Sequence, residues 1–266
     1  MAERHCHFIV FANEKGGTGK STAAVHTAVA LAAQGREVAV FDLDSRQKTT
    51  ARYLENRRAT AERLGIELPT PRFAVNNADN LAGFDRILDS ISRHAEFAII
   101  DTPGRDDTFA RVAATRADTL VTPVNDSFVD LDLIGRVDPE TYKVTRPSFY
   151  AELIWEARKS RANTDGGEVD WVVLRNRLQH IEARNMRRVA SALRELSRRV
   201  GFRVIPGLSE RVIYRELFPS GLTLLDIEQF ESVGLSHIAA RQELREMVAG
   251  FALPAAEVQQ SLFEAG

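Results

Sequence analysis

The stretch FIVFANEKGGTGKST at residues 8–22 decides the expected fold, because it joins a short apolar segment to the start of a helical pattern. Phe8–Ala12 is continuous in apolar residues, which is typical of a strand buried on both faces of a sheet. The helical pattern runs from Ser21 to Gln34, and Gly35 is a good C-terminal stop. A glycine-rich turn between a strand and a helix is the setting that a phosphate-binding loop requires.

The chemistry of this turn suits a nucleotide. Three glycines allow backbone N–H groups to surround an anion, and the helix N-terminus adds a partial positive charge. We expect Lys20 to contact the β- and γ-phosphates, the Ser21 hydroxyl to bind Mg²⁺, and Thr22 to reach the α-phosphate. Glu14 stands where ordinary phosphate loops have glycine, and Lys15 adds a second cation. The alternative is a turn that binds nothing. The predicted nucleotide-binding residues of the loop are Gly16, Gly17, Thr18, Gly19, Lys20, Ser21 and Thr22.

Two further apolar segments end in carboxylates. VAVFDLD at residues 38–44 ends in Asp42 and Asp44, which lie on one face because they are two residues apart on an extended chain. FAIIDTPG at residues 97–104 places Asp101 at the end of a strand. Ligands of open α/β sheets bind at these carboxyl ends. We therefore expect Asp101 to hold Mg²⁺ directly or through water, and Asp42 and Asp44 to converge on the metal, Lys20 or water.

The remaining chain alternates between short apolar strands and helical patterns. This alternation predicts one α/β domain over residues 1–266, with a doubly wound, mostly parallel sheet and helices on both faces. Residues 67–77 and 160–170 are expected to be surface connections rather than domain linkers. The expected strands are 8–12, 38–42, 97–101, 119–123 and 171–174, and the expected helices are 21–34, 80–94 and 182–200.

Composition narrows the classes of function. Charged residues make up 27% and hydrophobic residues 44% of the 266, which excludes general disorder. The net charge of −2 excludes a chain-wide basic field but not a local patch. Cys6 is the only cysteine, which excludes an internal disulfide framework and favours a cytoplasmic setting. No apolar run approaches the roughly 20 residues of a membrane helix, and the tail at 254–266 has no Lys or Arg, so we expect no membrane anchor.

The lysine that precedes the glycines, followed by Asp42-x-Asp44 and Asp101-Thr102-Pro103-Gly104, resembles the deviant Walker A motif of the ParA/MinD family over nearly the whole chain. Longer blocks resemble the MipZ branch of this family, bacterial ATPases that position the division plane. Those blocks are residues 13–17, 42–47, 125–130, 171–177 and 214–219. Three sibling groups fit less well. MinD-like proteins need a basic tail, larger ParA proteins carry an N-terminal DNA-reading domain, and nitrogenase iron proteins need cluster cysteines.

The resemblance implies ATP and Mg²⁺ as cofactors, slow ATP hydrolysis and an ATP-dependent homodimer. Lys15 would reach across that dimer to the partner's nucleotide, and Asp44 would position or activate the attacking water. Asp101 would hold Mg²⁺ through water. Asn176 would form a hydrogen bond to adenine, and Arg177 would stack on it.

For partners, the resemblance implies the centromere-binding protein ParB, DNA without sequence preference, and FtsZ, whose assembly would be inhibited. The protein would lie in the cytoplasm, associated with the nucleoid and the cell poles. Two alternatives stay open. One is a chromosome- or plasmid-partitioning ATPase of the ParA type. The other is a metabolic phosphate-loop enzyme similar to dethiobiotin synthetase, which would turn over a substrate without ATP-driven dimerisation.

The helical pattern at residues 182–200 has arginines along one side. With about 100° per residue, six of them fall within an arc of about 140°, and Val189, Leu193 and Leu196 lie on the opposite side. A solvated face is the alternative, but so many like charges favour an anionic partner. The predicted DNA-binding residues are Arg184, Arg187, Arg188, Arg194, Arg198 and Arg199.

Overall fold

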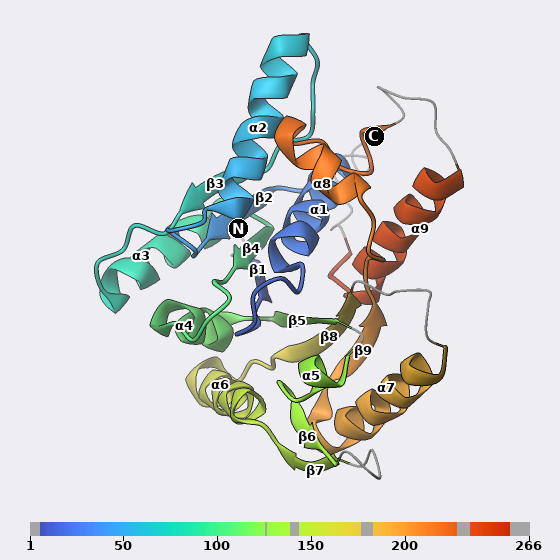
Figure 1. Ribbon diagram of the computed structural model, residues 1–266. Coiled ribbons are helices and arrows are strands. Elements are labelled where there is room, and N and C mark those ends of the chain that lie inside the picture. Colours follow the sequence, from blue (N-terminus) through green and yellow to red (C-terminus); the bar gives the residue numbers. More distant parts are fainter. Residues whose placement is uncertain (1–5, 126, 139–143, 177–182, 228–234, 256–266) are drawn as a thin grey trace, which may run out of the picture.

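A parallel sheet forms the centre of the molecule. The computed structural model describes residues 6–125, 127–138, 144–176, 183–227 and 235–255. Within these residues, seven strands form one parallel sheet in the order β3-β2-β4-β1-β5-β8-β9 (Figure 1). The strands of this sheet are β1 His7–Phe11, β2 Val38–Asp42, β3 Arg72–Val75, β4 Phe97–Asp101, β5 Thr119–Asn125, β8 Asp170–Asn176 and β9 Arg203–Pro206. A separate antiparallel pair consists of β6 Gly135–Val137 and β7 Val144–Pro147.

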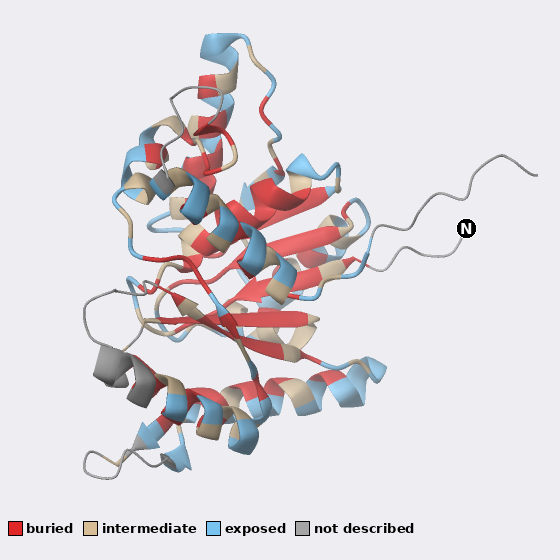
Figure 2. Ribbon diagram, turned by 90° about the vertical axis from the view of Figure 1, so that its right-hand side faces the viewer, coloured by how far each residue is buried: buried red, intermediate tan, exposed pale blue. Residues whose placement is uncertain are grey.

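Helices cover both faces of the sheet, so the predicted doubly wound α/β fold is confirmed. Figure 2 shows buried strands between helices whose outer surfaces are exposed. One face packs against α1 Lys20–Ala33, α2 Thr49–Leu64, α8 Ile213–Leu217 and α9 Leu235–Gly250. The other face packs against α3 Leu81–Ser92, α4 Thr108–Arg116, α6 Phe149–Asp165 and α7 Ala183–Leu196, with the short α5 at Phe128–Leu131. Among the described helices, none is both long and apolar enough to cross a lipid bilayer.

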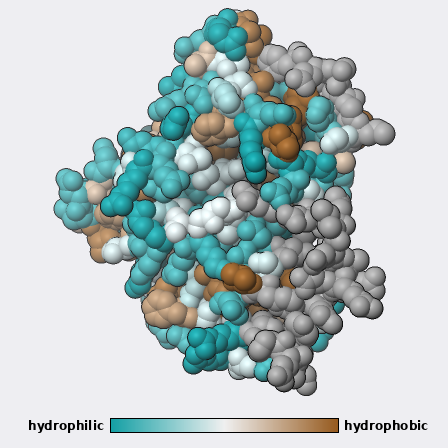
Figure 3. Space-filling view, in the orientation of Figure 1, coloured by the Kyte–Doolittle hydropathy of each residue, from teal (hydrophilic) through white to brown (hydrophobic). Residues whose placement is uncertain are grey.

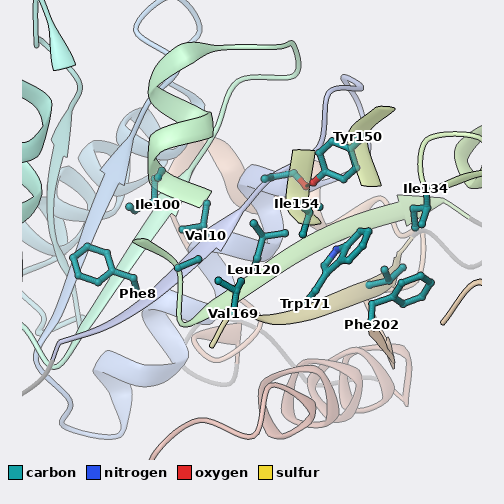
Figure 4. Close-up of a cluster of buried hydrophobic side chains, with 14 of the residues drawn as sticks. Phe8, Val10, Ile100, Leu120, Ile134, Tyr150, Ile154, Val169, Trp171 and Phe202 are labelled. Carbon is teal, nitrogen blue, oxygen red and sulfur yellow. Dashed lines mark hydrogen bonds between the residues drawn. The ribbon is translucent and has the colours of Figure 1, made fainter. Parts of the chain in front are cut away.

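The strands are continuously apolar because each one supplies two cores. Successive side chains point to opposite faces, so Ile9 and Ile99 enter one core while Val10 and Ile100 enter the other. Figure 4 shows part of the second core, in which Trp171 lies near Tyr150 and Phe202. This double burial explains why the five expected strands were visible in the sequence.

Three predictions about secondary structure are wrong. Residues 67–77 contain the edge strand β3, which is half-exposed and therefore lacks a strong apolar pattern. Helix α6 continues to Asp165, where Gly166 ends it in the left-handed conformation, so residues 160–165 are not a surface connection. Helix α7 ends at Leu196 and is followed by a π-helical turn at Ser197–Gly201, rather than running as one α-helix to residue 200.

The fold brings the segments that are predicted to bind a nucleotide to the carboxyl ends of the central strands. The end of β1 lies between the ends of β4 and β5, because the chain crosses from one side of β1 to the other between these two strands. In register, Phe11 is paired with Asp101, and Asp101 is paired with Asp42. Open α/β sheets bind ligands at such a switch point.

A buried ion pair joins α2 to the segment that precedes α9. The fully buried guanidinium of Arg57 donates to both oxygens of Asp226, at 2.7 and 2.9 Å, and also to the carbonyls of Pro69 and Gly221. Asp226 accepts two further hydrogen bonds, from the backbone and hydroxyl of Thr223. Burial alone would raise the pKa of Asp226, but Arg57 and Thr223 together hold it below its ordinary value.

We expect Arg57→Leu to lower the free energy of unfolding by about 3–5 kcal/mol, because it leaves a buried carboxylate without its partner. The exposed Arg52 on the same helix provides a control, and Arg52→Leu should change stability by less than about 0.5 kcal/mol. Because the pKa of Asp226 is lowered, its contribution is present above the ordinary value of 3.8 and is lost as the pH falls through the folded-state pKa. Urea denaturation should therefore show a smaller difference between parent and Arg57→Leu in acid than at neutral pH. An equal difference at both would contradict a charged Asp226.

Candidate functional site

The phosphate loop connects β1 to α1 and needs glycine at Gly17 and Gly19. Both have left-handed backbones, with φ of 76° and 85°. A Cβ atom at Gly19 would lie 2.2 Å from the side-chain nitrogen of Asn176, so no larger residue fits there. Lys20 is buried in the first turn of α1 and donates to the carbonyl of Lys15 at 2.9 Å. Burial lowers the pKa of Lys20 against the opposing effect of Asp101 and Asp44, so an added phosphate would favour its charged form.

Asn13 and Thr102 fix the position of this loop. The buried Asn13 side chain donates to the carbonyl of Pro123 at the end of β5 and accepts from the backbone of Lys15 at 2.6 Å. Thr102 donates from its backbone and its hydroxyl to the carbonyl of Phe11. The loop is therefore tied to the two strands on either side of β1, which makes it a rigid receptor for an anion.

Lys15 extends away from the phosphate loop and toward α5. Its Nζ donates to the carbonyl of Val129 and lies 3.1 Å from Oδ1 of Asp130. The other oxygen of Asp130 accepts from the backbone of Asn125, which holds the carboxylate in place. The side chain of Lys15 is 34% exposed. Its action on the nucleotide of a partner protomer stays a prediction.

Asp101 fits a magnesium site. Its Oδ2 accepts from the hydroxyl of Thr50 at 2.6 Å, whereas the buried Oδ1 has no partner among the described residues. Burial and the neighbouring Asp42 raise the pKa of Asp101 to about 7, against the opposing effects of the Thr50 and Ser21 hydroxyls and of the charge on Lys20. A cation would favour the ionised carboxylate. No group of three or more acidic, histidine or cysteine side chains suited to a metal is found in the described ranges. Binding of Mg²⁺ by Asp101 and Ser21 stays a prediction.

The two carboxylates after β2 have different surroundings. Asp42 is fully buried, and its oxygens accept from the backbones of Asp44, Thr50 and Ala51, at the start of α2. This role needs no metal, and metal binding by Asp42 stays a prediction. Asp44 lines the cavity at the phosphate loop and lies 3.9 Å from the guanidinium of Arg105. Its carboxylate accepts hydrogen bonds from the backbones of Arg46 and Gln47.

The predicted phosphate and metal residues meet around a cavity of about 320 Å³. The cavity brings together Gly16, Gly17, Gly19, Lys20, Ser21, Thr22, Asp44 and Asp101. Thr18 is buried and does not line this cavity. Sequence reasoning missed Arg105, which lines the same cavity, and Thr50, which orients Asp101. The only signal for Thr50 was its place near the start of the helix that follows Asp44, and this signal does not identify the partner carboxylate.

A smaller cavity of about 90 Å³ adjoins the loop at Gly19 and Thr22 and is lined by Asn176, Leu208 and Tyr214. The Asn176 side chain donates to the carbonyl of Thr18 at 2.8 Å and accepts from the backbone of Leu208 at 3.0 Å. Asn176 thereby joins the phosphate loop to the segment after β9. Its contact with adenine stays a prediction. Arg177 lies outside the described residues.

The arginine face is described in part. The apolar residues predicted for the opposite side, Val189, Leu193 and Leu196, are buried. Arg194 is exposed at the end of α7, and Arg198 and Arg199 are exposed in the π-helical turn, where Arg199 pairs with Glu195 at 2.8 Å. Arg184, Arg187 and Arg188 belong to α7, but their side chains lie outside the described ones.

The family of this chain is shown by a match over most of its length. A model of the ATPase MipZ family matches residues 7–255. The chain belongs to this family. The matched range includes the phosphate loop, Asp44, Asp101 and Asn176. A search of curated proteins returns no match.

Solved structures of ParA/MinD-type ATPases share the fold. Apo McdA from Cyanothece is 18% identical, with a TM-score of 0.64 over 93% of this chain and 100% of that one. MinD from Aquifex aeolicus is 13% identical, with a TM-score of 0.61 over 96% and 100%. MinD with Mg-ADP from Pyrococcus horikoshii is 16% identical, with a TM-score of 0.58 over 93% and 97%. At these identities the likeness shows the fold, which is that of the ParA/MinD ATPases.

Proposed function

We propose that this MipZ-family ATPase is an ATP-dependent dimerisation switch that regulates placement of the bacterial division site. The observation that carries the proposal is the position of Lys15. Its amine lies against α5, 3.1 Å from Asp130, while Lys20 lines the nucleotide cavity. Lys20 points into the cavity of its own protomer, whereas Lys15 points away from it and is partly exposed. This arrangement supports a nucleotide site that a second protomer completes.

The residues of the pocket have different roles in ATP hydrolysis. Lys20 and the loop amides would neutralise the β- and γ-phosphates. Ser21 and Asp101 would hold Mg²⁺, which would supply positive charge against the phosphate oxygens. Asp44 orients the attacking water. Phosphoryl transfer depends on position and charge, so turnover is slow until Lys15 of a second protomer arrives. Hydrolysis then releases the dimer.

The proposed partners follow from membership of the family. These partners are ParB, FtsZ and nonspecific DNA. We place the protein in the cytoplasm, at the nucleoid and the cell poles. Support for DNA comes from the exposed side chains of Arg194, in the last turn of α7, and Arg198, in the turn that follows. Buried Val189 and Leu193 anchor this helix. A dimer would double the phosphate contacts, so DNA binding should follow ATP-driven dimerisation.

Mass in solution, measured with ADP and with ATP, tests the switch. We expect a monomer with ADP and a dimer with ATP and Mg²⁺. A monomer under both conditions, with turnover that depends on a small-molecule substrate, would contradict the switch and favour a metabolic enzyme. Movement of a cargo instead of inhibition of FtsZ assembly would favour a partitioning ATPase.

The arginine face makes a separate prediction. We expect the double variant Arg194→Ala and Arg198→Ala to bind unrelated DNA duplexes more weakly and to flatten the salt dependence by about one logarithmic unit per lost phosphate contact. Arg63→Ala, an exposed change at the end of α2, is the matched control. Titrations across a salt series in the presence of ATP measure both quantities. If dimerisation is intact and neither quantity changes, these arginines do not bind DNA.

A further inference from the structure

Arg105 lines the nucleotide cavity with its hydrogen-bond donors unused. It shares the cavity with Lys20, Ser21 and Asp44. Its guanidinium lies 3.9 Å from Asp44 and 3.7 Å from Asp107, and it donates no hydrogen bond within the described part of the chain. A guanidinium has five N–H donors in a fixed plane. These donors are therefore available to a ligand that enters the cavity.

The two carboxylates beside Arg105 are held by other groups. Oδ1 of Asp44 accepts from two backbone N–H groups of the turn after β2, and Oδ1 of Asp107 accepts from two at the start of α4. Arg111, on α4, has almost the same exposed fraction as Arg105, 46% against 45%, but it donates two hydrogen bonds to Asp106. Long, partly exposed ion pairs such as those of Arg105 are weak. Its guanidinium can therefore turn from these neighbours to a stronger anion.

The segment that carries Arg105 is fixed against the phosphate loop. Thr102 donates from its backbone and its hydroxyl to the carbonyl of Phe11. A Cβ atom at Gly104 would lie 3.0 Å from the backbone of Gly16, so Gly104 packs directly on the loop. Because Arg105 is the next residue, its side chain begins beside the loop that would hold the phosphates.

The cavity has positive charge on two sides. In Figure 1 the loop between β1 and α1 lies toward the viewer, and Figure 3 shows that the surface on this side is mainly hydrophilic. Of the described residues that line the cavity, Lys20 and Arg105 are the two cations. Lys20 belongs to the loop, whereas Arg105 lies beside Asp44, where we place the attacking water. The position of Arg105 is thus at the γ-phosphate end of a bound ATP.

We propose that Arg105 binds the γ-phosphate of ATP within its own protomer and stabilises the transition state of hydrolysis. A planar guanidinium can donate to two phosphate oxygens at once. In this step the water oxygen bonds to the γ-phosphorus, and the bond to the β–γ bridging oxygen breaks with its electron pair left on ADP. A proton of the water is released to solvent, directly or through Asp44, while Arg105 stays charged. The negative charge is spread over the equatorial oxygens that Arg105 contacts.

Calorimetry with ADP and with a non-hydrolysable ATP analogue, each with Mg²⁺, tests the contact. We expect Arg105→Gln to weaken binding of the analogue by about tenfold and to leave ADP affinity within about twofold, because ADP lacks the γ-phosphate. Arg105→Lys should recover only part of the loss, since it keeps the charge but not the planar pair of donors. Light scattering selects a protein concentration at which the parent and the variants have the same mass, so that dimerisation does not alter the comparison.

Arg111→Gln is the matched control. Arg111 lines a second groove, between α4 and α6, that adjoins the nucleotide cavity, but it does not line the nucleotide cavity itself. The change removes the same charge from an equally exposed side chain and should alter neither affinity. Single-turnover assays then test the catalytic part. We expect Arg105→Gln to slow the chemical step by about 10- to 10²-fold and Arg111→Gln to keep the parent rate.

The possible results separate the parts of the proposal. Equal losses of ADP and analogue affinity would mean that Arg105 contacts a phosphate common to both or only shapes the loop. Slower hydrolysis with an unchanged preference for the analogue over ADP would mean that it acts through Asp44. Either result, or no change at all, would overturn the proposal, and a changed preference with the parent rate would overturn its catalytic part. The proposal rests on ATP hydrolysis but not on the switch. A parent protein that stays monomeric with ATP would therefore count against the proposed function alone.

Discussion

Lys20→Ala is expected to weaken ATP binding by about 10²- to 10³-fold, because it removes a buried cation from the site of the β- and γ-phosphates. Lys20 is held in the first turn of α1, and its amine bonds to the loop carbonyl of Lys15. No flexible neighbour replaces it, since the other lysine of the motif is directed toward Asp130. Isothermal titration with ATP and Mg²⁺ measures the loss.

Lys15→Ala should have a different effect. We expect it to bind ATP within a few-fold of the parent protein, because Lys15 contacts α5 rather than the pocket of its own protomer. It should stay monomeric with ATP, since the cation that reaches the partner's nucleotide is missing. Lys159→Ala, an exposed change of equal charge on α6, is the control. Chromatography with light scattering decides between the two roles, and an ATP-bound dimer of Lys15→Ala would contradict action across the interface.

The segments that could be predicted from the sequence are those whose structure is determined by residues close to one another in the chain. The phosphate loop combines a strand, glycines with left-handed backbones and a helix start, and all three leave a trace within fifteen residues. The ends of β2 and β4 were visible because central parallel strands are buried on both faces and stand out as apolar runs. The edge strand β3 lacks this double burial, and it was missed for that reason.

The parts of the site that escaped prediction depend on partners distant in the sequence. Asp130 binds Lys15 across 115 residues, and Asn176 joins Thr18 across 158. No regular spacing in the sequence predicts either contact, because both contacts depend on the order of the strands in the sheet. Glu14 illustrates the same limit. Its departure from the ordinary loop pattern was visible, but only the packing of α4 and α6 shows that it faces a second groove.

Asp44 is the residue whose replacement should separate binding from hydrolysis most clearly. Its carboxylate lies in the nucleotide cavity beside Arg105, at the end of a segment fixed by the buried Asp42. One of its oxygens also accepts from the backbones of Arg46 and Gln47, so alanine would loosen this turn as well as remove the charge. Asp44→Asn retains an oxygen for these hydrogen bonds and removes only the negative charge.

We therefore expect Asp44→Asn and Asp44→Ala to bind ATP and dimerise nearly as the parent does, but to hydrolyse ATP at least about 10²-fold more slowly, because a carboxylate that orients or deprotonates water acts mainly in the transition state. Asp79→Asn, at an exposed position before α3, controls for the loss of one charge. Single-turnover assays with bound ATP separate the chemical step from exchange of nucleotide. If Asp44→Asn hydrolyses ATP at the parent rate while only Asp44→Ala is slow, Asp44 shapes the turn and does not act on water. If both variants keep the parent rate, the water is held by another group, and Arg105 becomes the next residue to replace because it lines the same cavity.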